Sequence, residues 1–124
     1  MIKILRERAR LDLERQIRPY RRARLQGRPP EGWLRAMRLA TGLPVAQLAK
    51  TMELSNRMIF QIERSEQKRN IRLKELERMA RALECDVVYG LVPWQRSLED
   101  RAAELVEREL WRKRYTARKA GSRG

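Results

Sequence analysis

Two short apolar patterns, separated by a serine, lie in residues 43–63, LPVAQLAKTMELSNRMIFQIE. Leu48 and Met52 recur at helical spacing in the first pattern, and Ile59 and Ile62 recur in the second. Ser55 stands between the patterns, and serine is a preferred residue at the position that caps a helix start. The spacing therefore predicts two short helices joined by a tight corner, the layout of a helix-turn-helix.

The composition is strongly basic. The 124 residues carry a formal net charge of +14 and give a sequence pI of about 11.2. A pI above about 9 on a small domain is typical of nucleic-acid binding, although anionic membranes attract the same charge. No apolar run approaches the roughly 20 residues of a membrane span, and the N-terminus lacks a secretory apolar region. We therefore expect no membrane association.

The chain has no histidine and only one cysteine, Cys85. Histidine-dependent triads and His/Cys zinc sites are therefore excluded, and an internal disulfide cannot form. No Gly-rich phosphate loop is present. We expect no catalytic residues, no metal and no cofactor, and a single cysteine fits a reducing cytoplasm.

Charge divides the chain into three segments. Residues 1–29 have a net charge of +7, residues 30–92 of +3 and residues 93–124 of +4. The middle segment also has the densest apolar periodicity, so it is the expected folded domain. The first segment is expected to be a basic helical arm, and the last an amphipathic helix followed by a disordered basic tail.

Local signals place the expected helices, so the predicted fold is an all-α bundle with N- and C-terminal helical extensions. Proline and glycine set several of the boundaries. The first expected helix ends near Pro19 and is followed by an irregular tail at 21–28, the second is ended by Gly42, and the last precedes a disordered tail at 116–124. The fifth is predicted by an apolar stripe from Leu73 to Leu83. The expected helices are residues 3–18, 33–41, 44–52, 56–65, 73–83 and 97–113.

Residues 86–92, DVVYGLV, change to a β-branched and aromatic composition that predicts one short strand. A single strand leaves an unpaired edge, which invites pairing with another chain. We therefore predict a homodimer interface in this segment. The alternative is an extended segment packed on the preceding helix. The interface residues would be Val87, Val88, Tyr89 and Leu91.

The helix after Ser55 presents side chains suited to the edges of DNA bases. Arginine can bind guanine with two hydrogen bonds, and asparagine or glutamine can bind adenine in the same way. We expect base contacts from Asn56, Arg57 and Gln61. Phe60 could touch a thymine methyl group or pack against a partner. The competing interpretation is an ordinary solvated helix face.

Phosphate contacts require cationic or N–H groups around that helix. Candidates stand at its start, on the helix before it, and at its far end and the following loop. These residues are Ser55, Gln47, Lys50, Arg64, Lys68 and Arg69.

The order GLPVAQLAK…LSNRMIFQIERSEQ resembles the lambda-repressor-like, or XRE/Cro, helix-turn-helix family over about residues 33–84. The resemblance implies a compact helical bundle that reads double-stranded operator DNA. It also implies a structural ion pair between Arg38 and Glu63. Glu53 and Ser65 depart from the family pattern, because glycine often occupies both positions.

A second resemblance covers most of the chain. RPPEGWLRAMR, LKELERMARALECDVVYGLVPW and SLEDRAAELVEREL are similar to the family of small regulators called mobile mystery protein A. This resemblance implies an antitoxin-like autorepressor encoded beside a Fic-domain partner. The [S/T]xxxE[G/N] pattern of inhibitory Fic helices has no match here, so any neutralisation would use another surface.

Three functions are compatible with the sequence. The leading one is a cytoplasmic, nucleoid-associated, dimeric repressor of its own operon. The second is a toxin-neutralising interaction module that uses the amphipathic faces at 3–18 and 97–113. The third is a non-specific RNA or nucleoid binder, although seven aromatic residues provide no evident stacking platform.

Overall fold

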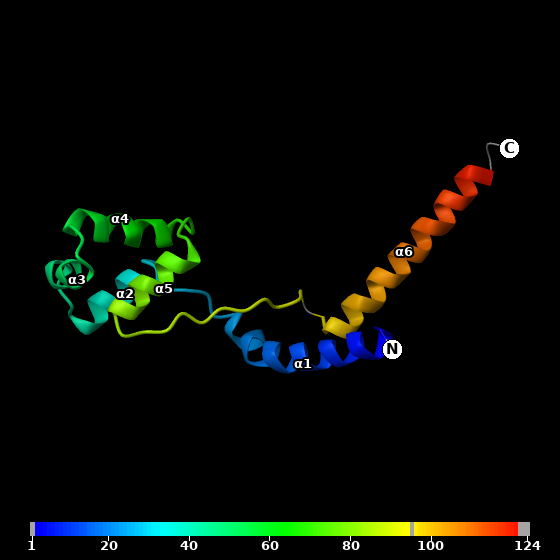
Figure 1. Ribbon diagram of the computed structural model, residues 1–124, viewed down its shortest axis with the longest axis horizontal. Coiled ribbons are helices and arrows are strands. Elements are labelled where there is room, and N and C mark those ends of the chain that lie inside the picture. Colours follow the sequence, from blue (N-terminus) through cyan, green and yellow to red (C-terminus); the bar gives the residue numbers. More distant parts are fainter. Residues whose placement is uncertain (1, 95, 122–124) are drawn as a thin grey trace. The chain divides into compact units, whose positions relative to one another are not determined.

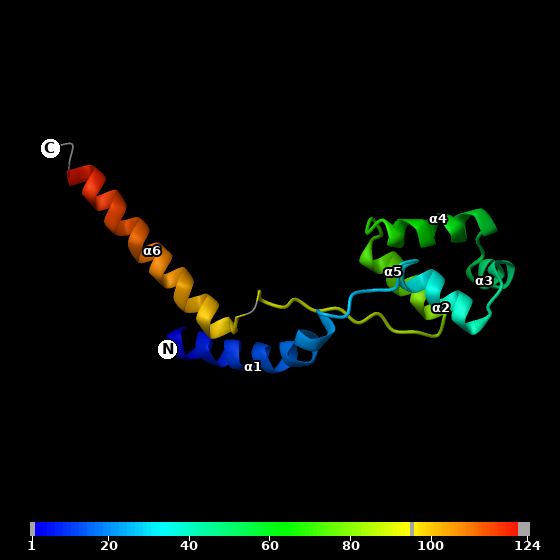
Figure 2. The ribbon, with the colours of Figure 1, turned by 180° about the vertical axis from the view of Figure 1, so that it is seen from behind.

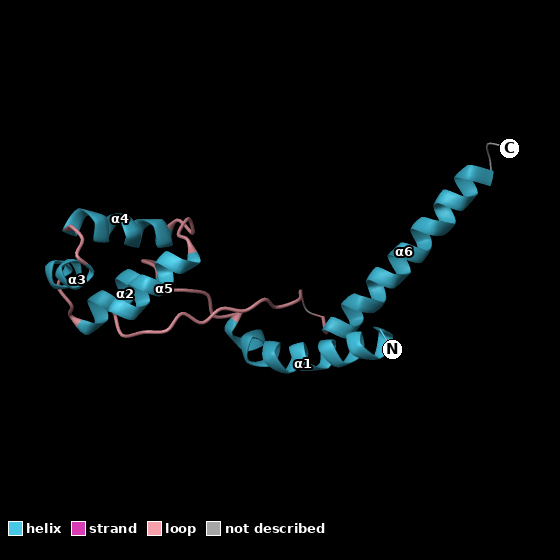
Figure 3. Ribbon diagram, in the orientation of Figure 1, coloured by secondary structure: helices cyan, strands magenta, loops and turns pink. Residues whose placement is uncertain are grey.

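A computed structural model describes residues 2–94 and 96–121. Within these ranges the chain forms six helices and no strand (Figure 3). The residues divide into two compact units, one of Gln26–Tyr89 and the other of Met1–Leu25 with Gly90–Gly124. The prediction of an all-α fold is confirmed, and each unit can be described by itself.

The first unit is a bundle of four helices, which stay together in both views of the molecule (Figures 1 and 2). The helices are α2 (Trp33–Thr41), α3 (Val45–Met52), α4 (Asn56–Gln67) and α5 (Leu73–Ala82). All four were predicted, and α4 continues two residues beyond the expected end at Ser65.

The corners of this bundle follow local chemistry. Gly42 ends α2 in the left-handed conformation with φ of 71°, where glycine meets no steric cost. Glu53 adopts the same conformation after α3 with φ of 56°, at a cost of roughly 1–2 kcal/mol for a residue with a Cβ. The Ser55 hydroxyl oxygen accepts a hydrogen bond from the Met58 amide at 3.2 Å, so Ser55 caps α4 as predicted.

The bundle encloses one apolar core. Leu48, Ile59 and Met79 are completely or almost completely buried, and they come from α3, α4 and α5 respectively. Burying one such side chain contributes roughly 1.5–3 kcal/mol relative to leaving it exposed. The other members of the core cluster are Leu34, Ala49, Met52 and Ile62.

The second unit contains α1 (Ile2–Ala23), which is longer than predicted. The helix continues through Pro19 and takes in part of the segment expected to be irregular. Long-range contacts of the residues after Pro19 account for the difference, because such contacts can outweigh local propensity. Arg21 donates to the Arg96 carbonyl oxygen at 3.1 Å, and Arg24 donates to the Pro93 carbonyl oxygen at 3.3 Å.

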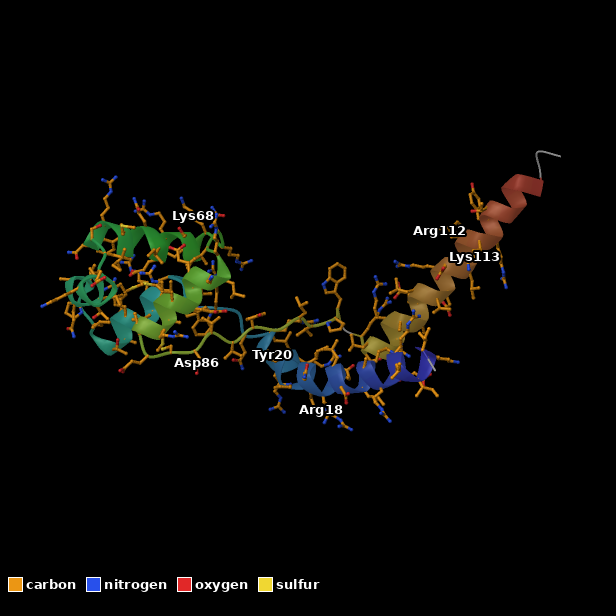
Figure 4. All side chains as sticks on the ribbon, in the orientation of Figure 1. Arg18, Tyr20, Lys68, Asp86, Arg112 and Lys113 are labelled. Atoms are coloured by element: carbon orange, nitrogen blue, oxygen red, sulfur yellow. The ribbon has the colours of Figure 1, made fainter. Side chains whose placement is uncertain are left out.

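The chain returns to this unit at Gly90, which lies against the Tyr20 side chain on α1 (Figure 4). A Cβ built at Gly90 would stand 2.9–3.0 Å from three atoms of the Tyr20 ring. Real Cβ atoms essentially never approach other atoms below 3.0 Å, so this packing requires glycine.

The last helix, α6 (Leu98–Gly121), begins against α1. The Asp100 amide donates to the Ser97 hydroxyl at 3.1 Å, which confirms the predicted start. Glu14 on α1 accepts from the Leu98 amide at 3.1 Å and pairs with Arg21. The hydrogen bond from Arg21, followed by that from Leu98, lowers the pKa of Glu14.

The expected end of this helix near Lys113 is wrong, because α6 continues to Gly121. The described part of the tail that was expected to be disordered, residues 116–121, is therefore helical. Alanine and arginine or lysine dominate that part, and all are good helix formers. Residues 122–124 lie outside the described residues.

The predicted strand at 86–92 is not formed within the described chain. A strand requires hydrogen bonds to a neighbouring strand, and the all-α chain offers none in the ranges that the structure describes. The strand prediction rested on apolar, β-branched composition alone, which does not provide a pairing partner. Pairing with a second copy stays a prediction.

Candidate nucleic-acid interface

Helix α4 has two clearly different faces. Its inward face holds Ile59 and Ile62, which are 0% and 7% exposed. Its outward face holds the residues predicted to contact bases and two neighbours, all exposed. These exposed residues are Asn56, Arg57, Met58, Phe60, Gln61 and Arg64.

Four of the outward side chains line one surface hollow of about 440 Å³. Arg57, Gln61 and Arg64 follow one another at spacings of four and three residues, so they share a helix face. Phe60 lies between them and supplies an apolar surface. The structure thus brings together three of the four predicted base-contacting residues: Arg57, Phe60 and Gln61. Asn56 is exposed at the start of α4 but does not line the hollow.

Phe60 is 47% exposed, and its ring faces the buried arginine of α2. The guanidinium carbon of Arg38 lies 6.0 Å from the ring centroid, at the limit of a cation–π contact. This contact covers part of the ring, while about half of the side chain stays exposed. Phe60 is therefore partly fixed and partly available to a ligand.

The two acidic residues of α4 are both buried and paired. Glu63 accepts from Arg38 Nε at 2.8 Å, and the side chains are only 3% and 8% exposed. Glu66 pairs with Arg28 Nη1 at 2.7 Å. The charged residues left exposed on α4 are Arg57 and Arg64. The outward face is therefore positive, because its own carboxylates are directed inward and neutralised.

The Arg38–Glu63 pair was expected from the family resemblance, and the structure contains it. The Arg28–Glu66 pair was not expected. Glu66 also accepts from the Leu34 amide at 2.9 Å, so its carboxylate serves the first turn of α2. The sequence signals for this pair are the arginine inside GRPPEG and a glutamate on the inner face of α4, but their spacing in the sequence does not show that the two meet.

The predicted phosphate-contacting residues surround this face. Gln47 and Lys50 are exposed on α3. Lys68 and Arg69 are exposed directly after α4, and Figure 4 shows Lys68 at that end. Arg64 lines the hollow itself, beside the candidate base contacts, although it was predicted to contact phosphate. The Ser55 oxygen is occupied by its cap bond, while its hydroxyl hydrogen remains available as a donor.

The residues predicted for a dimer interface are mostly exposed. Val88, Tyr89 and Leu91 are 72%, 67% and 88% exposed, and Val87 is half-buried. Three large apolar side chains within four residues at such exposure are typical of an interaction surface.

The described residues contain no group of three His, Cys, Asp or Glu residues arranged to hold a metal. None of their helices is both long enough and apolar enough to cross a membrane.

Residues 34–89 match the model of a family described as helix-turn-helix. The matched range contains nearly all of α2 and the whole of α3, α4 and α5. No curated protein and no solved structure matches the chain. The match supports the resemblance predicted for residues 33–84 and does not test the finer resemblance, which covers most of the chain.

Proposed function

We propose that the chain is a sequence-specific DNA-binding transcriptional regulator in which α4 is the recognition helix. The observation that carries this proposal is the composition of the outward face of α4. Arginine, glutamine and phenylalanine side chains meet there in one hollow, and both carboxylates of the helix are buried in ion pairs. A helix of this kind fits the major groove, which is about 12 Å wide.

Base recognition is assigned to the first two turns of α4. Arg57 suits the O6 and N7 acceptors of guanine, and Asn56 and Gln61 suit the N6 and N7 groups of adenine. In helix-turn-helix proteins the N-terminal residues of the recognition helix contact the bases. Phe60 is assigned to a thymine methyl group, because its half-exposed ring lines the hollow together with Arg57 and Gln61.

Phosphate contacts are assigned to the polar residues that flank this helix. Gln47 and Lys50 stand on the helix that precedes the corner, and Lys68 and Arg69 stand after the far end of α4. Arg64 reaches the hollow and can serve either a base or a phosphate. The Ser55 hydroxyl can donate to a phosphate while its oxygen caps the helix.

The regulator is proposed to act as a homodimer. One recognition helix reads only a few base pairs, so two half-sites supply useful specificity. The exposed apolar residues of segment 86–92 favour this segment as one contact between copies. Pairing of two such segments would satisfy the backbone groups that a lone extended segment leaves open.

The resemblance of most of the chain to mobile mystery protein A favours an antitoxin-like autorepressor with a Fic-domain partner. In this proposal the protein acts in the cytoplasm on an operator upstream of its own gene. A toxin-neutralising role is the second candidate function. It is favoured by the exposed apolar side chains of α1, including Ile4, Leu5 and Leu11.

The proposed function is tested by quantitative gel shift with the full chain and the DNA upstream of its gene. Arg57→Ala and Gln61→Ala should each lose roughly 1–3 kcal/mol of discrimination between operator and scrambled DNA. Lys74→Ala, an exposed cation on α5, is the matched control and should keep full discrimination. Unchanged discrimination in both α4 variants would refute the recognition-helix assignment.

The same titrations distinguish the proposed regulator from a non-specific nucleic-acid binder. A non-specific RNA or nucleoid binder would bind operator, random DNA and RNA equally at physiological salt, with a steep salt dependence for all three. A preference for operator that depends on Arg57 argues for the regulator.

A further inference from the structure

Helix α6 has a pronounced division of charge along its length. Residues 98–109 contain five acidic and two basic residues, whereas residues 110–121 contain five basic and no acidic residues. The helix is about 36 Å long at 1.5 Å per residue, so the two halves are separate patches of opposite sign. Figure 4 shows Arg112 and Lys113 in the basic half.

Among residues 98–116, the part of α6 whose burial is described, only the start of the helix is packed. Leu98, Ala102 and Glu104 are half-buried where α6 meets α1, while residues 105–116 are all exposed. Leu105, Val106 and Leu110 are 49%, 58% and 52% exposed. Helices in proteins are stabilised mainly by packing of an apolar face, and this length of α6 has none in the described chain.

The apolar residues have the spacing of a helix–helix seam. Ala103, Val106 and Leu110 follow one another at intervals of three and four residues, as in a heptad pattern. Glu107 and Arg114 are seven residues apart, so they lie on the same flank of that seam. The seam therefore has an acidic flank in its first half and a basic flank in its second.

Stabilisation of an isolated helix does not explain this charge division. Acidic residues favour the N-terminus of a helix dipole, but the effect is limited to about the first turn. It accounts for Glu99 and Asp100, and the i,i+4 ion pair with Lys113 accounts for Glu109, but neither effect accounts for Glu107. A nucleic acid would be attracted by the basic half and repelled by the acidic half.

We propose that α6 pairs with the α6 of a second copy of this chain in the antiparallel direction. In this direction the acidic half of each helix faces the basic half of the other, and the two helices meet at their middles, where Leu110 and Trp111 supply exposed apolar surface. A parallel pair would instead place acid against acid and base against base. The pairing is a second contact between copies, separate from segment 86–92, and it goes beyond the proposed DNA-binding role.

Charge reversal in the full chain tests the direction as well as the existence of this pairing. The variants are Glu107→Arg, Arg114→Glu and the double variant that carries both. Neither residue forms an ion pair in the part of the chain that the structure describes, so the pairs within α6 remain. Analytical ultracentrifugation over a concentration series, compared with the 14.8 kDa of one chain, gives the dimer dissociation constant, and circular dichroism gives the helix content.

Each single reversal should weaken the dimer by about tenfold or more, since like charges then oppose one another. The double variant should restore the dimer, and so should an equimolar mixture of the two single variants. Exposed Glu7→Arg on α1 is the control and should leave the dissociation constant unchanged.

An unchanged dissociation constant in both single variants, or a double variant that stays weak with normal helix content, would overturn the proposal. Binding to a duplex with one half-site is measured in parallel. Because a half-site needs only one recognition helix, loss of the α6 pairing and loss of the proposed DNA-binding function are distinguished.

Discussion

The guanidinium of Arg28 is joined to the carboxylate of Glu66 by a contact of 2.7 Å between Nη1 and Oε2. The same nitrogen donates to the Glu66 carbonyl oxygen at 2.7 Å, so Arg28 also holds the C-terminal end of α4. The other carboxylate oxygen of Glu66 accepts from the Leu34 amide. The buried Glu66 therefore links the C-terminal end of α4 to the start of α2 and to Arg28, in the segment before α2.

We predict that Glu66→Gln lowers the free energy of unfolding by about 1–3 kcal/mol, because the amide cannot satisfy both Arg28 and the Leu34 amide. The loss should stay below the cost of breaking a fully buried pair, since Arg28 is 27% exposed. Urea denaturation followed by circular dichroism measures it. Exposed Glu31→Gln is the control. Equal stability of the two variants would show that the contact has no structural weight.

Phe60→Ala should weaken operator binding while changing stability little, because the ring is half exposed and lies outside the apolar core cluster. The direct test replaces each operator thymine with uracil, which lacks the methyl group. One replacement should weaken the wild-type protein and have no effect on Phe60→Ala. If no uracil position discriminates between the two proteins, Phe60 does not touch a thymine methyl group.

Lys68→Ala should reduce affinity for operator and for random DNA by similar factors, since a phosphate contact carries no sequence information. The slope of log affinity against log salt should become shallower by about 0.9 for one lost phosphate contact. Gel-shift titrations at several salt concentrations measure the slope. Lys74→Ala should keep the wild-type slope, and an equal slope for both variants would remove Lys68 from the interface.

Acidification should loosen the start of α6. The pKa of Glu14 is lowered mainly by the Arg21 hydrogen bond, so the folded pKa lies below the unfolded pKa of about 4.3. The stabilisation is therefore complete above the unfolded pKa and is lost as pH falls through the folded pKa. Hydrogen-exchange protection of the Leu98 amide should fall over this range.

Glu14→Gln should reduce the protection of the Leu98 amide already at neutral pH and should abolish its change below pH 4.3. Glu7→Gln, on the same helix, is the matched control and should behave as the wild type. Identical pH profiles for all three proteins would contradict a role for Glu14 at this junction.

The helices of the unit formed by Gln26–Tyr89 could be predicted because their signals are local. Gly42 and Ser55 mark boundaries by their own backbone and side-chain chemistry, and Ile59 and Ile62 mark the inner face of α4. The exposed position of Arg57 and Gln61 follows from the same period. Only the structure shows that these two side chains line one hollow together with Phe60 and Arg64.

The remaining features depend on contacts between distant parts of the sequence. The continuation of α1 beyond Pro19 accompanies hydrogen bonds from Arg21 and Arg24 to carbonyl groups more than 60 residues away. The Arg28–Glu66 pair spans 38 residues. Residues 86–92 have the composition of a strand. The described chain has no neighbouring strand to form hydrogen bonds with them, so the strand that their composition predicts does not form.

The inner and outer faces of α4 can vary independently. Ile59, Ile62, Glu63 and Glu66 hold the helix in the bundle, while Arg57, Gln61 and Arg64 contribute little to that packing. If the outer residues read DNA as proposed, substitutions among them can change the preferred DNA sequence without compensating changes in the core. For a regulator of one operon, this separation would let a new binding site and a new reading surface evolve together in small steps, each of which leaves a folded protein.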